Sequence, residues 1–421
     1  MLKNLFKSDF VKNSSILIIG TVLAQIIPIA LQPIIRRTYT DAETGRFDLY
    51  LSIIAILASF VHLNYARTVV IPKKETDAIN LLGGALLSSF AVSLLIFILI
   101  LIGGKFFLNL FNLPLEILPW LKYIPLSVFA IGSYTSINFW LTRKKQFKEI
   151  SFNKFIRRGT EGIAQVTTTS ISSNGLILGS IIGDLVNLFI HTYQLAKSNF
   201  SLSKINWADM KQQLFAYKDF PIYSLLPTLL NTLSANIPVI MITSFFSDKI
   251  AGQFGLSRMV LAIPLALISV ALSQVLLQKV SEKRHNNESI YKIMKGTFFA
   301  LIGMSLVGTL IITLFSDQIF TFAFGEGWLM ASQFTQVLIF YFAVSFIATP
   351  LSSIFISLKK IKINSIWQII HFSLIISLYF FKDLTVINFI YAYTIINVLS
   401  YIVYGVLIYI VINQYEKQII K

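Results

Sequence analysis

The chain has 421 residues, of which 55% are hydrophobic and only 13% are charged, and its formal net charge is +16. Soluble proteins carry about 25% charged residues, so this composition excludes a water-covered surface and indicates that most of the outside faces lipid. The chain has no cysteine, and its four histidines are scattered without metal-ligand spacing. Disulfides, thiol catalysis, a metal site and a cofactor are therefore not expected.

Apolar stretches dominate the chain from end to end. A transmembrane helix needs about 20 apolar residues, and about twelve such stretches can be read along the sequence. This pattern predicts an all-α polytopic membrane protein with no sizeable soluble domain. The expected spans cover residues 14–35, 46–70, 79–102, 119–141, 152–172, 176–197, 220–244, 254–277, 294–316, 331–358, 363–381 and 385–412.

The loops between these spans alternate in charge. Every second loop is strongly basic, as in Arg143–Lys148 and Lys279–Lys292, whereas the loops between them hold few cations. Cytoplasmic loops carry such an excess of Lys and Arg, so both termini are expected in the cytoplasm. The net charge thus follows from membrane topology, and no nucleic-acid partner is expected. The pair Arg36 and Arg37 lies on the opposite side and departs from this rule.

The longest polar segment is 198–219. Trp207, Met210 and Leu214 lie there at helical spacing among lysines. The segment is expected to be either a helix on the cytoplasmic lipid surface or an ordinary connector.

The two halves of the chain echo one another. Ile27-Pro28 precedes Gly45-Arg46-Phe47, and Ile237-Pro238 precedes Gly252-Gln253-Phe254. With six spans each, both halves have the same orientation, which is the arrangement of transporters with parallel repeats. The expected divisions are an N-terminal half at 1–200, a cytoplasmic connector at 201–219 and a C-terminal half at 220–421.

Several short motifs together resemble a known family. They are Pro33–Thr40, Gly45–Tyr50, Val70–Lys74, Phe220-Pro221 with Asn231, Gly252–Arg258 and Phe324–Trp328. In this order and spacing they resemble the Wzx-type polysaccharide flippase family of the MATE-like MOP exporter superfamily, from about residue 20 to residue 370. One motif departs from the family: Asn64-Tyr65-Ala66-Arg67 stands where members often have Arg-Tyr-Glu. The lost carboxylate fits a more cationic cavity.

The resemblance implies a MATE-like fold and a transporter rather than an enzyme. It implies movement of a polyprenyl-diphosphate-linked oligosaccharide, such as an O-antigen unit of lipopolysaccharide, from the cytoplasmic to the outer leaflet of a bacterial inner membrane. The implied partners are this lipid-linked glycan, membrane lipid, and the glycan polymerase and ligase. The alternatives are a cation-coupled multidrug exporter of the same superfamily, a lipid II flippase, and a membrane glycosyltransferase or polymerase.

Arginines are the residues best suited to an anionic headgroup. A guanidinium pairs with phosphate oxygens through a planar fork. An arginine at mid-helix costs about 2.5–3.5 kcal/mol, so it should face a cavity or a partner. The candidates for binding the diphosphate are Arg36, Arg37, Arg67 and Arg258, although for Arg67 the favoured interpretation is that it reaches the cytoplasmic surface. The candidate neutral groups of the cavity are Gln25, Asn64 and Asn231.

Charged residues inside the fifth and sixth spans form a second candidate set. Asp184 follows two glycines that permit close helix packing, and it could bind a coupling cation or hold a neighbouring helix. Arg157 and Arg158 could anchor the cytoplasmic end of their span, with Glu161 at helical spacing as an internal partner.

Overall fold

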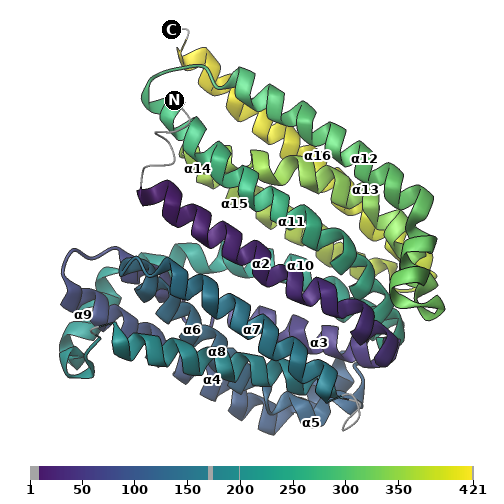
Figure 1. The fold of residues 1–421 in the computed structure, drawn as a ribbon, viewed down its shortest axis with the longest axis horizontal. Coiled ribbons are helices and arrows are strands. Elements are labelled where there is room, and N and C mark those ends of the chain that lie inside the picture. Colours follow the sequence, from purple (N-terminus) through teal and green to yellow (C-terminus); the bar gives the residue numbers. More distant parts are fainter. Residues whose placement is uncertain (1–8, 169–173, 199, 420–421) are drawn as a thin grey trace. The chain divides into compact units, whose positions relative to one another are not determined.

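The computed structural model describes residues 9–168, 174–198 and 200–419. Within these residues the chain consists of helices and short connections, with no β-strand. By its internal contacts it divides into two compact units, Met1–Ala251 and Gly252–Lys421 (Figure 1). The all-α polytopic fold class is confirmed. The division into two six-helix halves stays a prediction.

Most helices of each unit are long enough to cross a membrane. The first unit contains α2 (Asp9–Thr38), α3 (Asp41–Ala58), α4 (Glu75–Leu110), α5 (Leu118–Leu121), α6 (Ile124–Arg143), α7 (Phe147–Thr167), α8 (Gly175–Lys197), α9 (Trp207–Ala216), α10 (Leu225–Phe245) and the first turn of α11 (Asp248–His285). The second unit contains the rest of α11, α12 (Tyr291–Phe324), α13 (Leu329–Leu351), α14 (Ser353–Ser357), α15 (Ile361–Ile376) and α16 (Val386–Ile419).

Nine helical segments of the described residues have the length and hydropathy of membrane spans. Their outward faces are apolar: Ile102 of α4 is 82% exposed and Phe322 of α12 is 86% exposed. Large apolar faces of this kind are not left in water by soluble proteins, so they contact lipid. The chain is therefore a multi-pass membrane protein. The predicted spans at 14–35, 46–70 and 152–172 fall on α2, α3 and α7, outside these nine, and residues 169–172 lie outside the described part.

The second predicted span is not one continuous helix. It begins earlier, at Asp41, because Thr40 and Glu43 form a capping box in which each side chain binds the other's backbone N–H. It ends at Ala58, and a separate 3-10 helix, η1 (Tyr65–Val70), follows. Leu63 and Asn64 between them have φ values of 47° and 59°. A left-handed backbone interrupts a right-handed helix.

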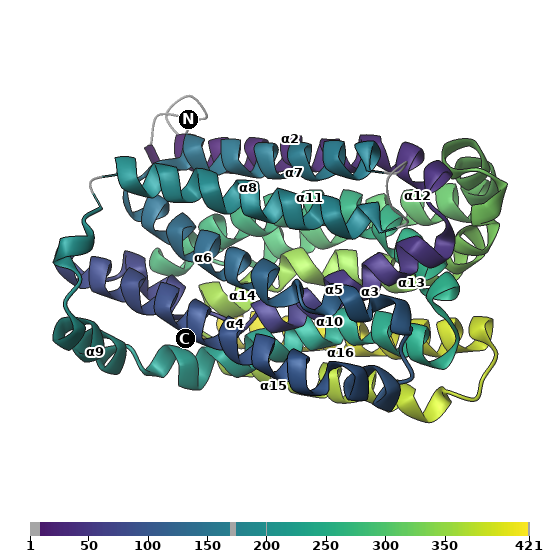
Figure 2. The same ribbon diagram turned by 90° about the horizontal axis from the view of Figure 1, so that it is seen from below.

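Glycines allow α7 and α8 to approach closely in the first unit. Helices α2, α7 and α8 lie side by side (Figure 2). A Cβ at Gly179 of α8 would lie 2.5 Å from Gln165 Cγ and 2.8 Å from the Gln165 backbone nitrogen of α7. Only a residue without a side chain fits there, which is the usual role of small residues between membrane helices.

Replacing Gly179 with alanine should therefore destabilise the protein by about 1–3 kcal/mol, the usual cost of overpacking. The matched control is Gly308→Ala in α12, where a Cβ meets no atom within 4 Å. That change should be neutral or stabilise by up to about 1 kcal/mol, because alanine favours a helix over glycine. Unfolding of both purified variants in the same detergent measures the difference, and equal stabilities would contradict the packing argument.

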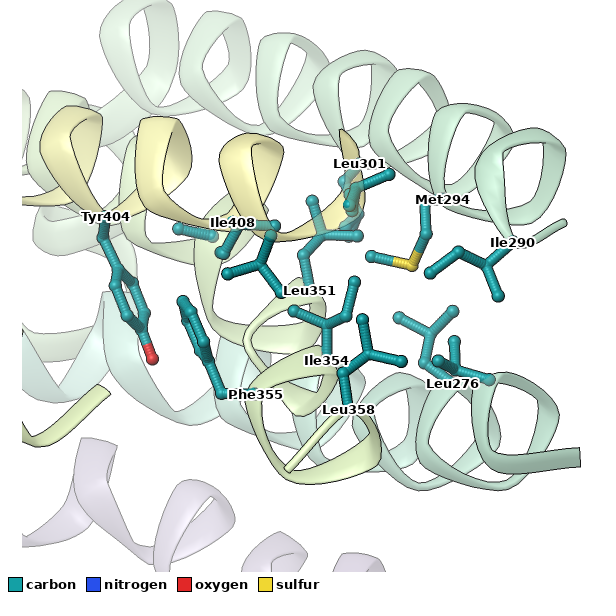
Figure 3. Packing of buried hydrophobic residues seen from close by; sticks show 14 of the residues in the cluster. Leu276, Ile290, Met294, Leu301, Leu351, Ile354, Phe355, Leu358, Tyr404 and Ile408 are labelled. Atoms are coloured by element: carbon teal, nitrogen blue, oxygen red, sulfur yellow. The ribbon is translucent and has the colours of Figure 1, made fainter. Parts of the chain in front are cut away.

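The core of the second unit lies between α11, α12, α14 and α16. Leu276, Met294, Ile354 and Ile408 come from these four helices and meet in one buried cluster (Figure 3). In the same cluster the Trp367 ring of α15 stacks on Tyr404 of α16 at 3.8 Å between ring centroids. Several aromatic rings of the cluster thus hold α15 and α16 together.

In its described residues, the predicted surface segment contains a 3-10 helix at Leu202–Lys204 and the short α-helix α9. Met210 is buried, and Leu214 packs against Gly84 of α4. Trp207 and Phe215 are 68% and 69% exposed. One face of α9 therefore packs on the first unit, while its other face presents aromatic groups as an interfacial helix does.

Candidate functional site

The first unit contains a buried ion pair between α7 and α8. Arg157 donates from Nε and from one terminal nitrogen to Asp184 Oδ1, at 3.0 and 2.9 Å. Asp184 is only 1% exposed, and the Arg157 guanidinium also lies 5.7 Å from the centre of the Tyr134 ring. Two of the four predicted charged residues of this set are thus brought together across a helix interface.

The other two predicted residues pair within one helix. Arg158 donates to Glu161 Oε2 at 2.9 Å, one turn further along α7. The Glu161 side chain is largely buried, while the Arg158 side chain is 32% exposed. Each carboxylate of the set therefore has its own guanidinium.

Further hydrogen-bonded polar side chains lie beyond Asp184, toward the C-terminal end of α8. His191 Nε2 lies 3.0 Å from Asn138 Oδ1 of α6 and 3.2 Å from Asn153 Nδ2 of α7. Asn153 and Gln194 exchange two further hydrogen bonds, at 2.7 and 2.8 Å. These residues were not predicted as a network.

The sequence does contain a signal for this network. Asp184, Asn187, His191 and Gln194 are spaced by three, four and three residues, which places them on one face of a helix. A polar stripe at that spacing in an apolar span indicates a face turned toward other helices rather than toward lipid.

The end of α2 holds the predicted pair Arg36 and Arg37 in two different environments. Arg36 is only 6% exposed, its Nε donates to Gln32 Oε1 at 3.1 Å, and its guanidinium lies 4.0 Å from Asp48 Oδ2 of α3. Arg37 is exposed. The structure therefore covers the first guanidinium and leaves the second on the surface of the described chain.

A further ion pair joins α3 to the first turn of α11. Arg46 donates to Asp248 Oδ2 at 2.8 Å, and both side chains are mostly covered. Beside it, Lys249 Nζ lies 3.8 Å from Asp41 Oδ2. The sequence alone does not reveal the partners of Asp41 and Asp248, because they lie far away along the chain.

The remaining candidates of the first unit lie apart. Asn64 is fully buried and donates from Nδ2 to Ser224 Oγ at 3.0 Å. Arg67 and Asn231 are exposed, and Gln25 is partly exposed. Asn64 is the residue just before η1, and Arg67 lies within η1, three residues further on.

Arg258 belongs to the second unit and lies among aromatic rings. Its guanidinium is 5.5 Å from the centre of the Phe254 ring, and it interacts electrostatically with Tyr341 and Tyr393. Gln253 and Ser257, its neighbours on α11, bind the turn before α13 and its first turn: Gln253 Nε2 donates to the Gly327 carbonyl and Ser257 Oγ to the Ala331 carbonyl. These bonds fix the rotation of α11 and hence the direction of Arg258.

The Phe324–Trp328 motif has a structural reason. Gly325 has φ of 98°, a conformation that glycine adopts without strain, and it ends α12. Trp328 is buried, 4% exposed, in a cluster with Leu256 and Phe320. The motif therefore forms the turn beside the Arg258 region.

No group of three metal-ligating side chains occurs within the residues that the structure describes. The charged groups brought together there are cation–carboxylate pairs. Such pairs hold helices together, and their cations would bind another anion only after the carboxylate contact opens.

Comparison with known proteins agrees with this architecture. A family model described as "Polysaccharide biosynthesis protein" matches residues 34–333. Among curated proteins no sequence matches the chain.

Several solved transporters share the fold. One is an inward-facing multidrug resistance MATE family transporter of the MOP superfamily, 14% identical, with a TM-score of 0.74 over 94% of this chain and 99% of the other. The outward-facing form of such a transporter is 15% identical, with a TM-score of 0.66 and 98% of each chain covered. A MOP superfamily transporter from Pyrococcus furiosus, for which reverse polarity of the binding pocket suggests a different function, is 15% identical, with a TM-score of 0.65 and 98% of each chain covered.

Identities this low speak for the fold alone, whereas the family match covers most of the chain. The resemblance seen in the motifs is thereby confirmed. The chain belongs to the polysaccharide biosynthesis protein family and has the fold of the MATE-like MOP superfamily transporters.

Proposed function

We propose that the protein is a flippase that moves a polyprenyl-diphosphate-linked oligosaccharide, such as an O-antigen unit, from the cytoplasmic to the outer leaflet. The observation that carries this proposal is the family match over residues 34–333 in a chain with a transporter fold. A chain of a polysaccharide biosynthesis family that has the fold of an exporter fits the membrane-crossing step of that biosynthesis, and transport by alternating access needs no catalytic residue.

The location follows from the same proposal. The basic loops alternate along the sequence, and this favours a bacterial inner membrane with both termini in the cytoplasm. The partners in this proposal are the lipid-linked glycan and membrane lipid, followed by the polymerase and ligase that use the exported unit.

We propose that arginines neutralise the diphosphate during transport. Of the four candidates, Arg258 is the first to test, because it is partly exposed and its direction is fixed by Gln253 and Ser257. Arg37 and Arg67 are exposed and could meet the headgroup where it enters or leaves. Arg36 is covered and lies close to Asp48, so its contribution would require that contact to loosen.

The alternative is a cation-coupled multidrug exporter. Such a protein needs a buried carboxylate that can accept a cation or proton. Asp184 is the most deeply buried carboxylate described, and Arg157 already neutralises it. This arrangement supports the flippase proposal, and it supports a packing role for Asp184 over a coupling role.

Complementation tests the proposal. Deleting the gene should remove one surface glycan while its lipid-linked precursor accumulates on the cytoplasmic side. Arg258→Ala should fail to restore the glycan, and Arg258→Lys should restore it in part because the charge is kept. Lys382→Ala, an exposed cation in the turn before α16, is the matched control and should restore it fully. A deletion strain with normal surface glycan and greater drug sensitivity would instead support the exporter.

A further inference from the structure

The second unit contains a polar cavity that is separate from the Arg258 region. Its volume is about 730 Å³, within the range of pockets that hold small ligands. It lies where the end of α11, the turn before α15 and the last turns of α16 meet. Its polar lining residues are Arg284, His285, Asn287, Lys360, Gln414, Tyr415 and Gln418.

The charge of this cavity is positive. Arg284 and Lys360 line it, and no aspartate or glutamate does. The acidic residues nearby have other partners: Glu288 pairs with Lys283 at 2.8 Å, and Glu416 accepts the backbone N–H groups of Ile290 and Tyr291. Within the described residues neither Arg284 nor Lys360 forms a salt bridge, so both charges remain for a ligand.

The cavity is held in shape by its surroundings. Arg284 donates from one terminal nitrogen to the Ser357 carbonyl at 2.8 Å. This bond fixes the position of the guanidinium, and its other N–H groups can donate to a ligand. Two turns border the cavity, and each is closed by a residue with positive φ, Asn287 at 52° and Lys359 at 58°. Their closing bonds are Glu288 N–H to Lys283 O at 2.8 Å and Lys360 N–H to Phe355 O at 2.7 Å, as in helix ends of the Schellman type.

From these features we propose that the cavity binds the phosphate-bearing headgroup of an anionic lipid. Arg284 supplies a planar fork and Lys360 a point charge, and phosphate oxygens accept strong hydrogen bonds from both. The amides of Asn287, Gln414 and Gln418 suit the hydroxyl groups of a glycerol or sugar headgroup. The bordering loops belong to the basic set, which is expected to face the leaflet rich in anionic lipid.

The same phosphate chemistry occurs in two lipids, a phospholipid and a prenyl diphosphate. The cavity shares no residue with the arginines assigned to transport, so a loss of binding in this cavity can be told apart from a failure of the flippase proposal. A direct binding measurement separates the two sources and does not depend on transport activity.

The test uses the full-length protein, stripped of lipid in a neutral detergent, and native mass spectrometry. Short-chain phosphatidylglycerol, short-chain phosphatidylcholine and farnesyl diphosphate are titrated separately. The Arg284→Gln/Lys360→Gln variant should bind phosphatidylglycerol or farnesyl diphosphate about tenfold more weakly than the unchanged protein, since about 1.4 kcal/mol of lost contact corresponds to a tenfold change. The arm in which this loss appears identifies the source, and a loss in both assigns recognition to the phosphate itself.

The matched control is Lys292→Gln/Lys417→Gln. Both lysines are exposed and neither lines the cavity, and this control removes the same two positive charges as the cavity variant. An equal loss of binding in this control would overturn the proposal, because general attraction to a basic surface would then explain it. Unchanged binding in the cavity variant, or equally tight binding of phosphatidylcholine, would also overturn it. If the double variant unfolds, Lys360→Gln alone replaces it and should weaken anion binding by several-fold.

Discussion

Replacing Arg157 with leucine should lower the free energy of unfolding by about 3–5 kcal/mol, because the change leaves the Asp184 carboxylate buried without its cation. Asp184 is 1% exposed, and its Oδ1 accepts both hydrogen bonds from Arg157. Water cannot replace these contacts without opening the interface between α7 and α8. Unfolding of the purified variant in detergent, followed by helical circular dichroism against a chemical denaturant, measures the loss.

The double variant Arg157→Leu/Asp184→Leu separates the pair from its individual charges. Removing both partners of a buried ion pair is often neutral or stabilising, so the double variant should recover most of the stability lost in the single variant. Arg158→Leu is the control, because Arg158 is 32% exposed and pairs within its own helix. That variant should lose at most about 1 kcal/mol. Additive losses at Arg157 and Asp184 would show that the two side chains are not coupled.

The same set of variants distinguishes the two roles that the sequence leaves open for Asp184, helix packing and binding of a coupling cation or proton. If the pair only holds α7 against α8, the stable double variant should still restore the surface glycan in the deletion strain. If Asp184 exchanges a cation or proton during transport, the double variant should be stable but inactive. The structural interpretation therefore predicts activity together with stability.

The helices could be predicted because long apolar runs have few alternatives to crossing a membrane. The predicted pairing of Glu161 inside the fifth span was also within reach, since residues three apart on a helix are neighbours, and the structure pairs it with Arg158. The ion pair between Arg157 and Asp184 could not be predicted, because it depends on which faces of α7 and α8 meet. Gly179 and Gly183 were recognised as packing residues, but their spacing does not state which helix they pack against.

Other failures have local causes. Hydropathy predicts a single span over residues 46–70, whereas α3 ends at Ala58. Leu63 and Asn64, which follow it, have positive φ values, and hydropathy does not reveal the backbone conformation of such residues. The Thr40–Glu43 capping box was readable and marks the true start of α3. The pair between Arg46 and Asp248 joins residues 202 positions apart, and no periodicity connects them.

Reversing the charge of Arg46 should break its ion pair with Asp248. Arg46→Asp should bring two carboxylates together where a cation now lies 2.8 Å from Asp248. Both side chains are about four-fifths covered, so repulsion between them is weakly screened. The first turn of α11 should then separate from α3, and the charge-swapped variant Arg46→Asp/Asp248→Arg should restore the contact.

The lack of native cysteine makes this separation measurable. Thr44 lies two residues before Arg46 and is 1% exposed, so a single thiol introduced by Thr44→Cys is protected while α3 stays covered. In the Arg46→Asp background its reaction with a maleimide should accelerate at least about tenfold, which corresponds to a shift of about 1.4 kcal/mol between covered and open forms. The swapped background should return the rate toward its original value.

Lys249→Ala is the control: the Lys249 ammonium is 3.8 Å from Asp41 and its side chain is 64% exposed, so this change should alter the rate by less than about threefold. If the Thr44→Cys thiol reacted equally fast in all four backgrounds, the covering of the start of α3 would not depend on the Arg46–Asp248 pair.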